Sequence, residues 1–291
     1  MTPAVDTSVL RLALPKGRMQ AEVFNLLADA GVRIRVGGRD YRPNVSLPAC
    51  EVKLLKPQNI VEMLAAGSRD AGFTGLDWVA ELGANVVELL DTGLDPVRLV
   101  AAAPEDLLQD GGLPSRKLVV ASEYERLTKA WIGRRGITAA YLRSYGATEV
   151  FPPEDADVIV DNTATGATLE ANGLVVIDEL MASTTRLFAN AAALEDPVRR
   201  EPIERLVLLL QSVLEARRRV MLEVNVAPDR LEAVCRALPC MREPTVSPLH
   251  GGAGYAVKAA VPRSELPSVI PRLKACGGTD IVVTGLSHLV A

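Results

Sequence analysis

Apolar residues follow two alternating patterns over the first two-thirds of the chain. Short apolar runs at 10–14 and 52–55 are each followed by a segment with helical periodicity, at 21–30 and 60–66 respectively. The apolar run at 118–121 repeats this arrangement further along the chain. Strands that are apolar throughout and alternate with helices are typical of a parallel sheet covered on both faces. The pattern therefore predicts a doubly wound α/β fold.

The alternation is interrupted once, and the interruption predicts two lobes. Near Asp95 the chain continues as an extended run at 97–103, and a second strand and helix series begins after the loop at 110–114, which contains Gly and Pro. Later apolar runs at 174–177 and 186–189 are expected to return toward the first lobe. Two lobes joined in this way enclose a cleft, and ligands of such sheets bind at the carboxyl ends of strands. We expect a two-lobe arrangement like that of type II periplasmic binding proteins.

The last third of the chain has a different order of elements. Residues 197–217 have apolar residues on one face and charges on the other, which predicts one long connecting helix. From 220 to 284 the order is strand, helix, strand, strand, helix, strand, as in a ferredoxin-like α+β unit. Asp229 and Ser264 precede the two helices as expected N-caps. The predicted parts are lobe I at 1–95 with a return segment at about 185–211, lobe II at 96–184, and a C-terminal domain at 212–291.

Composition and charge indicate a compact protein that does not bind nucleic acid. Of the 291 residues, 48% are hydrophobic and 23% are charged, which is typical of globular domains. Residues 1–215 hold 22 basic and 30 acidic residues, whereas 216–291 hold 10 and 6. This change from −8 to +4 supports a domain boundary. The basic end has no clustered patch beyond Arg217, Arg218 and Arg219, which we interpret as a solvated helix end.

Cysteine and histidine positions argue against a structural metal site. The four cysteines show no CxxC or Cys/His spacing, and the chain has only two histidines, so structural zinc is not expected. His250 and His288 are interpreted as ordinary surface or packed residues, not as catalytic bases. The N-terminal residues lack a signal-peptide pattern, and no apolar stretch reaches the length of a membrane span. We expect a cytoplasmic protein with reduced thiols and no membrane association.

The segment at 156–174 contains the most informative chemistry. An apolar strand ends at Asp161, and a loop rich in Thr and Gly then opens a helix. Amide groups at a helix start, together with the helix dipole, attract an anion, and Gly166 permits close approach of the backbone. Asp161 is placed to accept hydrogen bonds from sugar hydroxyls. On these residues alone an ordinary capped helix start is the simpler interpretation, but phosphate and ribose together describe a phosphoribosyl group.

Several ordered motifs resemble those of ATP phosphoribosyltransferases, and the similarity covers most of the chain. The motifs are LALPKGRM at 12–19, DAGFTGLDW at 70–78, LVVASEY at 118–124, RSYGATEV at 143–150 and the loop at 161–168. The resemblance implies that this loop binds phosphoribosyl pyrophosphate through Asp161, Thr163, Thr165, Gly166, Ala167 and Thr168. Ala164 departs from the family, in which many relatives carry an acidic residue, so Asp161 is expected to carry more of the ribose binding.

The resemblance implies an enzyme that joins N1 of ATP to phosphoribosyl pyrophosphate and releases pyrophosphate, the first step of histidine biosynthesis. Mg²⁺ is expected as cofactor, held mainly through substrate oxygens, with no dedicated protein ligands. The expected catalytic residues are Lys16, Arg18 and Asp161. The expected ATP-binding residues are Lys16, Gly17, Arg18, Asp77 and Tyr145.

Three of these assignments have a plain structural alternative. As a bare P-K-G-R sequence, the segment Lys16–Arg18 reads as a solvated turn, and only the resemblance makes it a substrate loop. Asp77 is equally consistent with a helix cap, and Tyr145 with a packed ring.

The resemblance also implies regulation and assembly. The C-terminal unit corresponds to the ACT-like domain of the long form, in which L-histidine binds as feedback inhibitor, and the loop at 246–254 is a candidate for its site. The same resemblance implies a homohexamer built from dimers. The alternative class is a two-lobe binding module without enzymatic activity, either a solute-binding protein or the effector domain of a regulator. The absence of a signal peptide and of a helix-turn-helix segment counts against these two.

Overall fold

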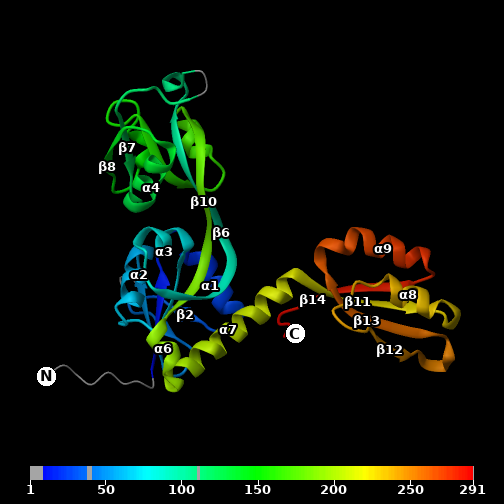
Figure 1. The fold of residues 1–291 in the computed structure, drawn as a ribbon. Helices are drawn as coiled ribbons and strands as arrows, with labels where there is room; N and C mark the ends of the chain where they lie inside the picture. Colours follow the sequence, from blue (N-terminus) through cyan, green and yellow to red (C-terminus); the bar gives the residue numbers. More distant parts are fainter. Residues whose placement is uncertain (1–8, 38–40, 110–111, 291) are drawn as a thin grey trace. The chain divides into compact units, whose positions relative to one another are not determined.

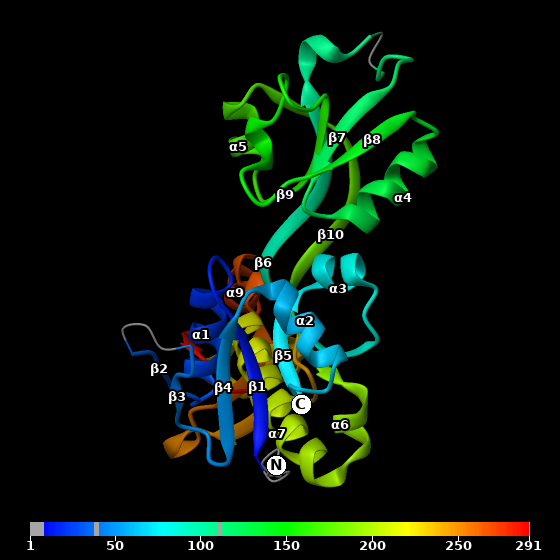
Figure 2. The ribbon, with the colours of Figure 1, turned by 90° about the vertical axis from the view of Figure 1, so that its left-hand side faces the viewer.

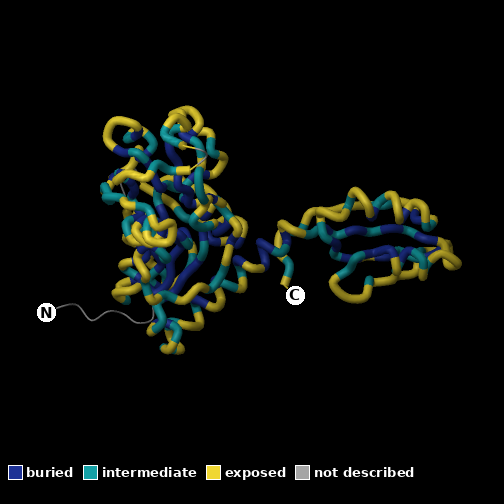
Figure 3. The backbone as a smooth tube through the Cα atoms, turned by 45° about the horizontal axis from the view of Figure 1, so that its top comes forward, coloured by how far each residue is buried: buried dark blue, intermediate teal, exposed yellow. Residues whose placement is uncertain are grey.

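The computed structural model describes residues 9–37, 41–109 and 112–290 of the chain (Figure 1). Backbone contacts divide it into two compact units. The first holds the residues up to Ala28 together with Val32–Glu204, and the second holds Asp29–Gly31 together with Arg205–Ala291. Each unit has its own buried core, which Figure 3 shows as dark segments of the tube. Asp110 and Gly111, the first residues of the loop expected between the lobes, lie outside the described residues.

The first unit is built on one mixed sheet of eight strands. These strands are β1 Leu10–Pro15, β4 Cys50–Leu55, β5 Ala71–Gly75, β6 Val86–Pro104, β7 Leu118–Ser122, β8 Ala139–Arg143, β9 Val158–Thr163 and β10 Leu174–Asn190. Their order across the sheet is β4-β1-β5-β10-β6-β9-β7-β8. β1 is parallel to β4 and β5, and β7 is parallel to β8 and β9, whereas β6 and β10 run antiparallel between these two sets. A separate hairpin joins β2 Ile34–Arg35 to β3 Asn44–Val45.

Strands β6 and β10 belong to both lobes. They pair with each other from Val86 and Asn190 at one end to Pro104 and Leu174 at the other. β5 of lobe I pairs with the last part of β10, and β9 of lobe II pairs with the second half of β6. The two lobes are therefore joined by a two-stranded ribbon, visible between them in Figure 1. The predicted return of the chain toward lobe I is confirmed.

Helices cover the sheet in both lobes (Figure 2). They are α1 Gln20–Asp29, α2 Pro57–Ala65, α3 Leu76–Leu82, α4 Glu125–Arg135, α5 Ala167–Ala171 and α6 Ala191–Glu195. Gly72 of β5 lets α2 pack closely, because a Cβ at this position would lie 2.8 Å from Ile60 Cγ2 and 3.0 Å from Ala13 Cβ. A side chain there would push the helix away from the sheet. The predicted two-lobed α/β fold is confirmed.

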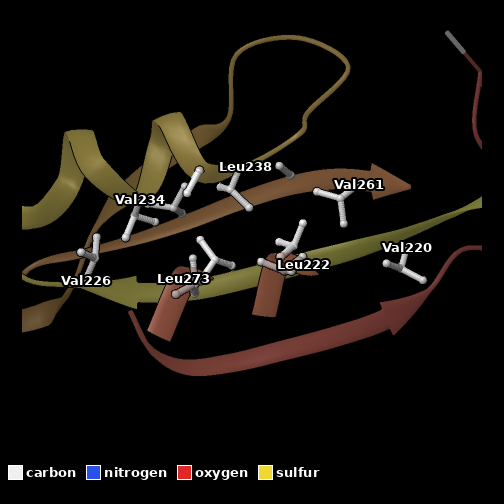
Figure 4. Packing of buried hydrophobic residues seen from close by; sticks show 12 residues of the cluster. Val220, Leu222, Val226, Val234, Leu238, Val261 and Leu273 are labelled. Carbon is white, nitrogen blue, oxygen red and sulfur yellow. The ribbon is translucent and has the colours of Figure 1, made fainter. Parts of the chain in front are cut away.

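The second unit is a four-stranded sheet with two helices. Helix α7, Pro197–Arg218, leads into it, and the elements that follow are β11 Arg219–Val226, α8 Leu231–Ala237, β12 Thr245–Pro248, β13 Tyr255–Pro262, α9 Leu266–Ala275 and β14 Thr279–Gly285. The strand order β12-β13-β11-β14 is that of a ferredoxin-like sheet, as predicted. Alternate residues of β11, among them Val220 and Leu222, point into a core that Val234 of α8 and Leu273 of α9 complete (Figure 4).

The predicted N-caps of this unit are wrong. Asp229 lies inside a 3-10 turn at Pro228–Arg230, and Ser264 lies inside another at Arg263–Glu265. Neither α8 nor α9 has a side-chain cap, because each helix is entered through a tighter turn of the same backbone. His250 and His288 are both exposed, and His288 Nδ1 lies 2.8 Å from Ser212 Oγ.

Candidate active site

A cavity of about 240 Å³ lies between the two lobes of the first unit. Its lobe I wall comes from α2 and α3, and its lobe II wall from the loops that follow β7 and β8. Since β7 and β8 are parallel neighbours, these loops lie at the carboxyl ends of strands, where α/β sheets bind their ligands. The lining residues are Lys56, Gln58, Asn59, Glu62, Trp78, Glu81, Leu82, Glu123, Arg143, Ser144 and Tyr145.

The lobe II wall presents an aromatic ring and a guanidinium group to the cavity. Tyr145 is 89% exposed, so the packed interpretation of its ring is wrong. Arg143 donates to the backbone oxygen of Glu123 over 2.9 Å, and the hydroxyls of Ser144 and Thr148 lie 2.8 Å apart. These bonds fix the wall while the Tyr145 ring stays open to a planar base, which aromatic rings bind by stacking.

The segment Lys16–Arg18 lies at the carboxyl end of β1. The Lys16 amide donates to the backbone oxygen of Leu55 over 2.9 Å, and its ammonium nitrogen lies 4.9 Å from the centre of the Tyr41 ring. Arg18 reaches the lobe-joining ribbon instead, where its Nη1 lies 3.6 Å from Asp95 Oδ1. Neither cation is among the residues that line the cavity described above.

The loop expected to bind the phosphoribosyl group is held by hydrogen bonds of its own threonines. Thr163 Oγ1 accepts from the Gly166 amide over 3.0 Å, and Thr165 Oγ1 accepts from the Ala167 amide over 3.3 Å. Gly166 has φ +88°, which favours glycine. The helix that follows, α5, has only five residues. Its dipole is therefore smaller than the sequence pattern suggested, and amides and hydroxyls of the loop are the groups that would bind phosphate.

Asp161 lies within β9, which continues to Thr163, so the predicted end of the strand at Asp161 is two residues too early. Its Oδ1 accepts from the amide of Asn162 over 2.7 Å. The pKa of Asp161 is raised to about 6, mainly by burial and in smaller part by the carboxylates of Glu149 and Glu123, against the opposing hydrogen bond from the Asn162 amide. Glu123 is also one of the residues that line the cavity.

Asp77 occupies a different place from the one expected. It is 2% exposed, and its two carboxylate oxygens already accept hydrogen bonds from Ser183 Oγ over 2.7 Å and from the Tyr124 hydroxyl over 2.6 Å. The carboxylate therefore lies behind the cavity wall. Its neighbour Trp78, which does line the cavity, stacks on Tyr124 with ring centres 4.4 Å apart.

The sequence analysis did not single out the residues at the start of α2. Lys56, Gln58 and Asn59 all line the cavity. A signal was present, because Lys56 follows β4 as Lys16 follows β1, and these two strands are parallel neighbours. Cations after adjacent parallel strands meet at one edge of a sheet.

No cluster of His, Cys, Asp or Glu able to hold a metal ion occurs among the described residues. Likewise, none of the helices in the described ranges is long and apolar enough to cross a membrane.

Comparison with known proteins gives matches over nearly the whole chain. Residues 56–212 match the family ATP phosphoribosyltransferase, and residues 216–288 match the family described as HisG, C-terminal domain. An ATP phosphoribosyltransferase of Pelotomaculum thermopropionicum is 39% identical over 288 residues, which are 97% of this chain and 99% of that protein. One from Chlorobaculum parvum is 36% identical over 290 residues, 98% of this chain and 99% of its own.

A solved structure agrees with these matches. The ATP phosphoribosyl transferase (HisG:HisZ) complex from Thermotoga maritima contains a chain that is 25% identical, with a TM-score of 0.63. The alignment covers 71% of this chain and 99% of that one. With two lobes around a cavity and full-length relatives of one activity, the chain belongs to the ATP phosphoribosyltransferase family, in the long form that carries the C-terminal domain.

Proposed function

We propose that the cavity between the lobes is where this phosphoribosyltransferase joins ATP to phosphoribosyl pyrophosphate in histidine biosynthesis. The observation that carries the proposal is a contact: Tyr124, which follows the cavity-lining Glu123, accepts a hydrogen bond from Asn162, the neighbour of Asp161. This contact supports one site that holds both the base-binding and the phosphate-binding elements. A binding module without activity is not favoured, because the relatives that match the full length are enzymes.

The two substrates are assigned to opposite sides of this site. Phosphoribosyl pyrophosphate binds through Asp161, Thr163, Thr165, Gly166, Ala167 and Thr168. The exposed ring of Tyr145 stacks on the adenine, and Lys16, Gly17 and Arg18 bind phosphates, with Lys16 as a mobile charge and Arg18 as a planar fork. Asp77, expected on the ATP side, contributes there only through its neighbour Trp78, which lines the cavity, because its own oxygens are already bonded.

The reaction needs alignment more than acid-base catalysis. N1 of the adenine attacks C1 of the ribose with inversion, C1 gains oxocarbenium character and pyrophosphate leaves with the bonding electrons. Asp161 holds the ribose hydroxyls while Lys16 and Arg18 stabilise the negative charge of the leaving pyrophosphate. Mg²⁺, held mainly through substrate oxygens and water as the family resemblance implies, would supply further charge neutralisation.

The remaining assignments concern regulation and assembly. Lobe I at 1–95 with a return segment at 185–211, and lobe II at 96–184, form the catalytic part, and 212–291 form the regulatory domain. L-Histidine binds this domain as feedback inhibitor, and the enzyme works as a cytoplasmic homohexamer of dimers. These assignments follow from the family resemblance and from the complete ferredoxin-like sheet of the second unit.

The test combines an assay with two substitutions. Pyrophosphate release should require ATP, phosphoribosyl pyrophosphate and Mg²⁺ together. Thr168→Ala and Asp161→Asn should weaken phosphoribosyl pyrophosphate binding in calorimetry by about 1.5–3 kcal/mol, the range for hydrogen bonds to charged groups, and leave ATP binding almost unchanged.

Thr138→Ala is the matched control, because Thr138 is exposed and precedes β8 at the opposite end of the strand from the site. If Thr168→Ala and Asp161→Asn each weakened the binding of both substrates by the same small amount, the loop would not be part of the phosphoribosyl pyrophosphate site.

A further inference from the structure

We propose that Tyr124 is a positioning residue that ties the phosphoribosyl loop of lobe II to the buried carboxylate of Asp77 in lobe I. The inference rests on the proposed function, because it takes the segment at 161–168 as the phosphoribosyl pyrophosphate site. Tyr124 touches neither substrate in this role. It acts through Asn162, the residue that follows Asp161.

In lobe I, three atoms of Asp77 are hydrogen-bonded: its amide nitrogen and both carboxylate oxygens. Asp77 Oδ2 accepts from the Tyr124 hydroxyl over 2.6 Å, and Oδ1 accepts from Ser183 Oγ over 2.7 Å. The amide of Asp77 donates in turn to Ser183 Oγ over 3.1 Å. Ser183 belongs to β10 of the lobe-joining ribbon and is 3% exposed. The carboxylate cannot turn without breaking bonds that no water can replace.

The lobe II end leads directly to the candidate ribose-binding group. Asn162 Nδ2 donates to the Tyr124 hydroxyl oxygen over 2.9 Å. The amide of the same residue donates to Asp161 Oδ1 over 2.7 Å. Asn162 therefore holds the Asp161 carboxylate through its backbone amide, and the Asn162 side chain is itself held by the hydroxyl of Tyr124. The phosphoribosyl loop begins immediately after it.

Electrostatics fix the direction of the bonds. Burial raises the pKa of Tyr124 well above its usual value, and the Asp77 carboxylate raises it further, so the phenol keeps its proton. The phenol then donates to Asp77 and accepts from Asn162, and both of its hydrogen-bonding functions are used. The Asn162 side chain must present its NH₂ group to Tyr124, which leaves this side chain one orientation.

The hydroxyl of Tyr124 is separable from the packing of its ring. The residue is completely buried, and its ring stacks on Trp78 of lobe I. Tyr124→Phe keeps the ring and its stack and removes only the oxygen through which the two lobes are bonded. If Tyr124 had only a structural role, this variant would be less stable than the parent, but the ratio of the KM values for the two substrates would stay the same.

The test compares Tyr124→Phe with Tyr141→Phe in the full-length chain. Tyr141 is a matched control because its hydroxyl donates to a backbone oxygen, that of Ser122, over 2.7 Å within lobe II. Tyr124→Phe removes both hydrogen bonds of the hydroxyl and should raise the KM for phosphoribosyl pyrophosphate about tenfold, with the KM for ATP changed less than about twofold. Tyr141→Phe should change neither KM, and both variants should stay folded in thermal melts.

A double-mutant cycle tests the route through Asn162. Asn162→Ala removes the same connection at its other end, so Tyr124→Phe combined with Asn162→Ala should be no worse than the more affected single variant. Additive losses would overturn the proposal, as would equal changes in the two KM values for Tyr124→Phe. If Tyr124→Phe does not fold, the KM ratio of Asn162→Ala decides the question alone.

Thr168→Ala separates this proposal from the one on which it rests. If Thr168→Ala weakens phosphoribosyl pyrophosphate binding and Tyr124→Phe does not, the positioning role is wrong and the site assignment stands. If neither variant has an effect, both are wrong.

Discussion

The carboxyl group of Asp161 is partly buried beside two other acids, an environment that opposes its charge. A strand end followed by a Thr- and Gly-rich loop was enough to predict this residue as a site residue. Its shifted pKa was not predictable, because Glu123 and Glu149 come from loops that are distant in sequence and meet Asp161 only in the folded lobe. Hydrogen bonding to a ribose needs the charged form, so binding and stability place opposite demands on this side chain.

Asp161→Asn should therefore stabilise the folded chain at neutral pH. The folded pKa of about 6 lies above the usual 3.8. Between these values the folded chain keeps a proton that the unfolded chain loses, so the contribution of Asp161 to stability falls as pH rises from about 4 to about 6. Above that range Asp161 is charged in both states, and the buried charge lowers the free energy of unfolding by about 1–2 kcal/mol after allowance for the partial exposure of the group. Urea unfolding should show the variant more stable at pH 7.5, with the difference nearly gone at pH 4.

Asp157→Asn is the control of opposite sign. Arg116 and the amide of Val119 lower the pKa of Asp157, so its stabilising contribution is present above the usual pKa and is lost as pH falls. This variant should be less stable than the parent at pH 7.5. A gain from Asp161→Asn that is equal at both pH values would show that burial of charge is not its cause.

At the scale of secondary structure, the apolar pattern predicted buried strands well and the joining ribbon poorly. The expected runs at 97–103, 174–177 and 186–189 are parts of the much longer β6 and β10. Residues such as Asp178, Glu179 and Thr184 interrupt the apolar pattern of β10, yet they are part of the strand. The ribbon is partly exposed where it leaves one lobe for the other, so its strand character depends on pairing and not on burial.

Helix α4 shows a contact that sequence could not predict. Its own first residues supply no side-chain cap. Instead Glu81 of α3, in lobe I, accepts from the amides of Arg126 over 2.9 Å and Leu127 over 3.0 Å. Capping patterns are read from neighbouring residues, whereas this cap comes from 45 positions away.

Glu81→Ala should destabilise the first unit by about 1–2 kcal/mol, the usual cost of losing an N-cap, and Glu81→Gln should cost less because one acceptor oxygen remains. Urea unfolding measures the loss. Hydrogen exchange should accelerate first at the amides of Arg126 and Leu127. Glu62→Ala is the control, since Glu62 lines the same cavity and its side chain accepts a hydrogen bond from Asn59 within α2. Equal destabilisation by both alanine variants would show that the cap has no specific effect.

At the scale of the whole chain, sequence predicted a separate C-terminal part but not where one compact unit ends and the next begins. The change of charge and the ferredoxin-like order both indicated a separate C-terminal part. Contacts divide the chain between Glu204 and Arg205, and the expected boundary at 211/212 lies within α7 as well. A continuous amphipathic helix contains no local mark of a boundary, because its periodicity is the same on both sides.

A chain that ends at Gln211 should be a folded catalytic part that L-histidine does not inhibit. The chain in the Thermotoga maritima complex aligns over 99% of its length with only 71% of this chain, so a shorter chain of this fold exists. The cut keeps Ile203, Leu206 and Leu210 of α7, which are buried, and removes the whole ferredoxin-like sheet.

An inhibitor bound to the removed part can act only if it favours one state of the full enzyme over another, and that coupling is lost with its domain. Pyrophosphate release with and without L-histidine, measured for the full chain and for residues 1–211, tests this, with light scattering to establish that the shorter chain is folded and soluble. Full inhibition of the shorter chain would refute the regulatory assignment. A folded but inactive shorter chain would mean that the C-terminal domain is needed to assemble the active enzyme, since the residues assigned to both substrates all precede the cut.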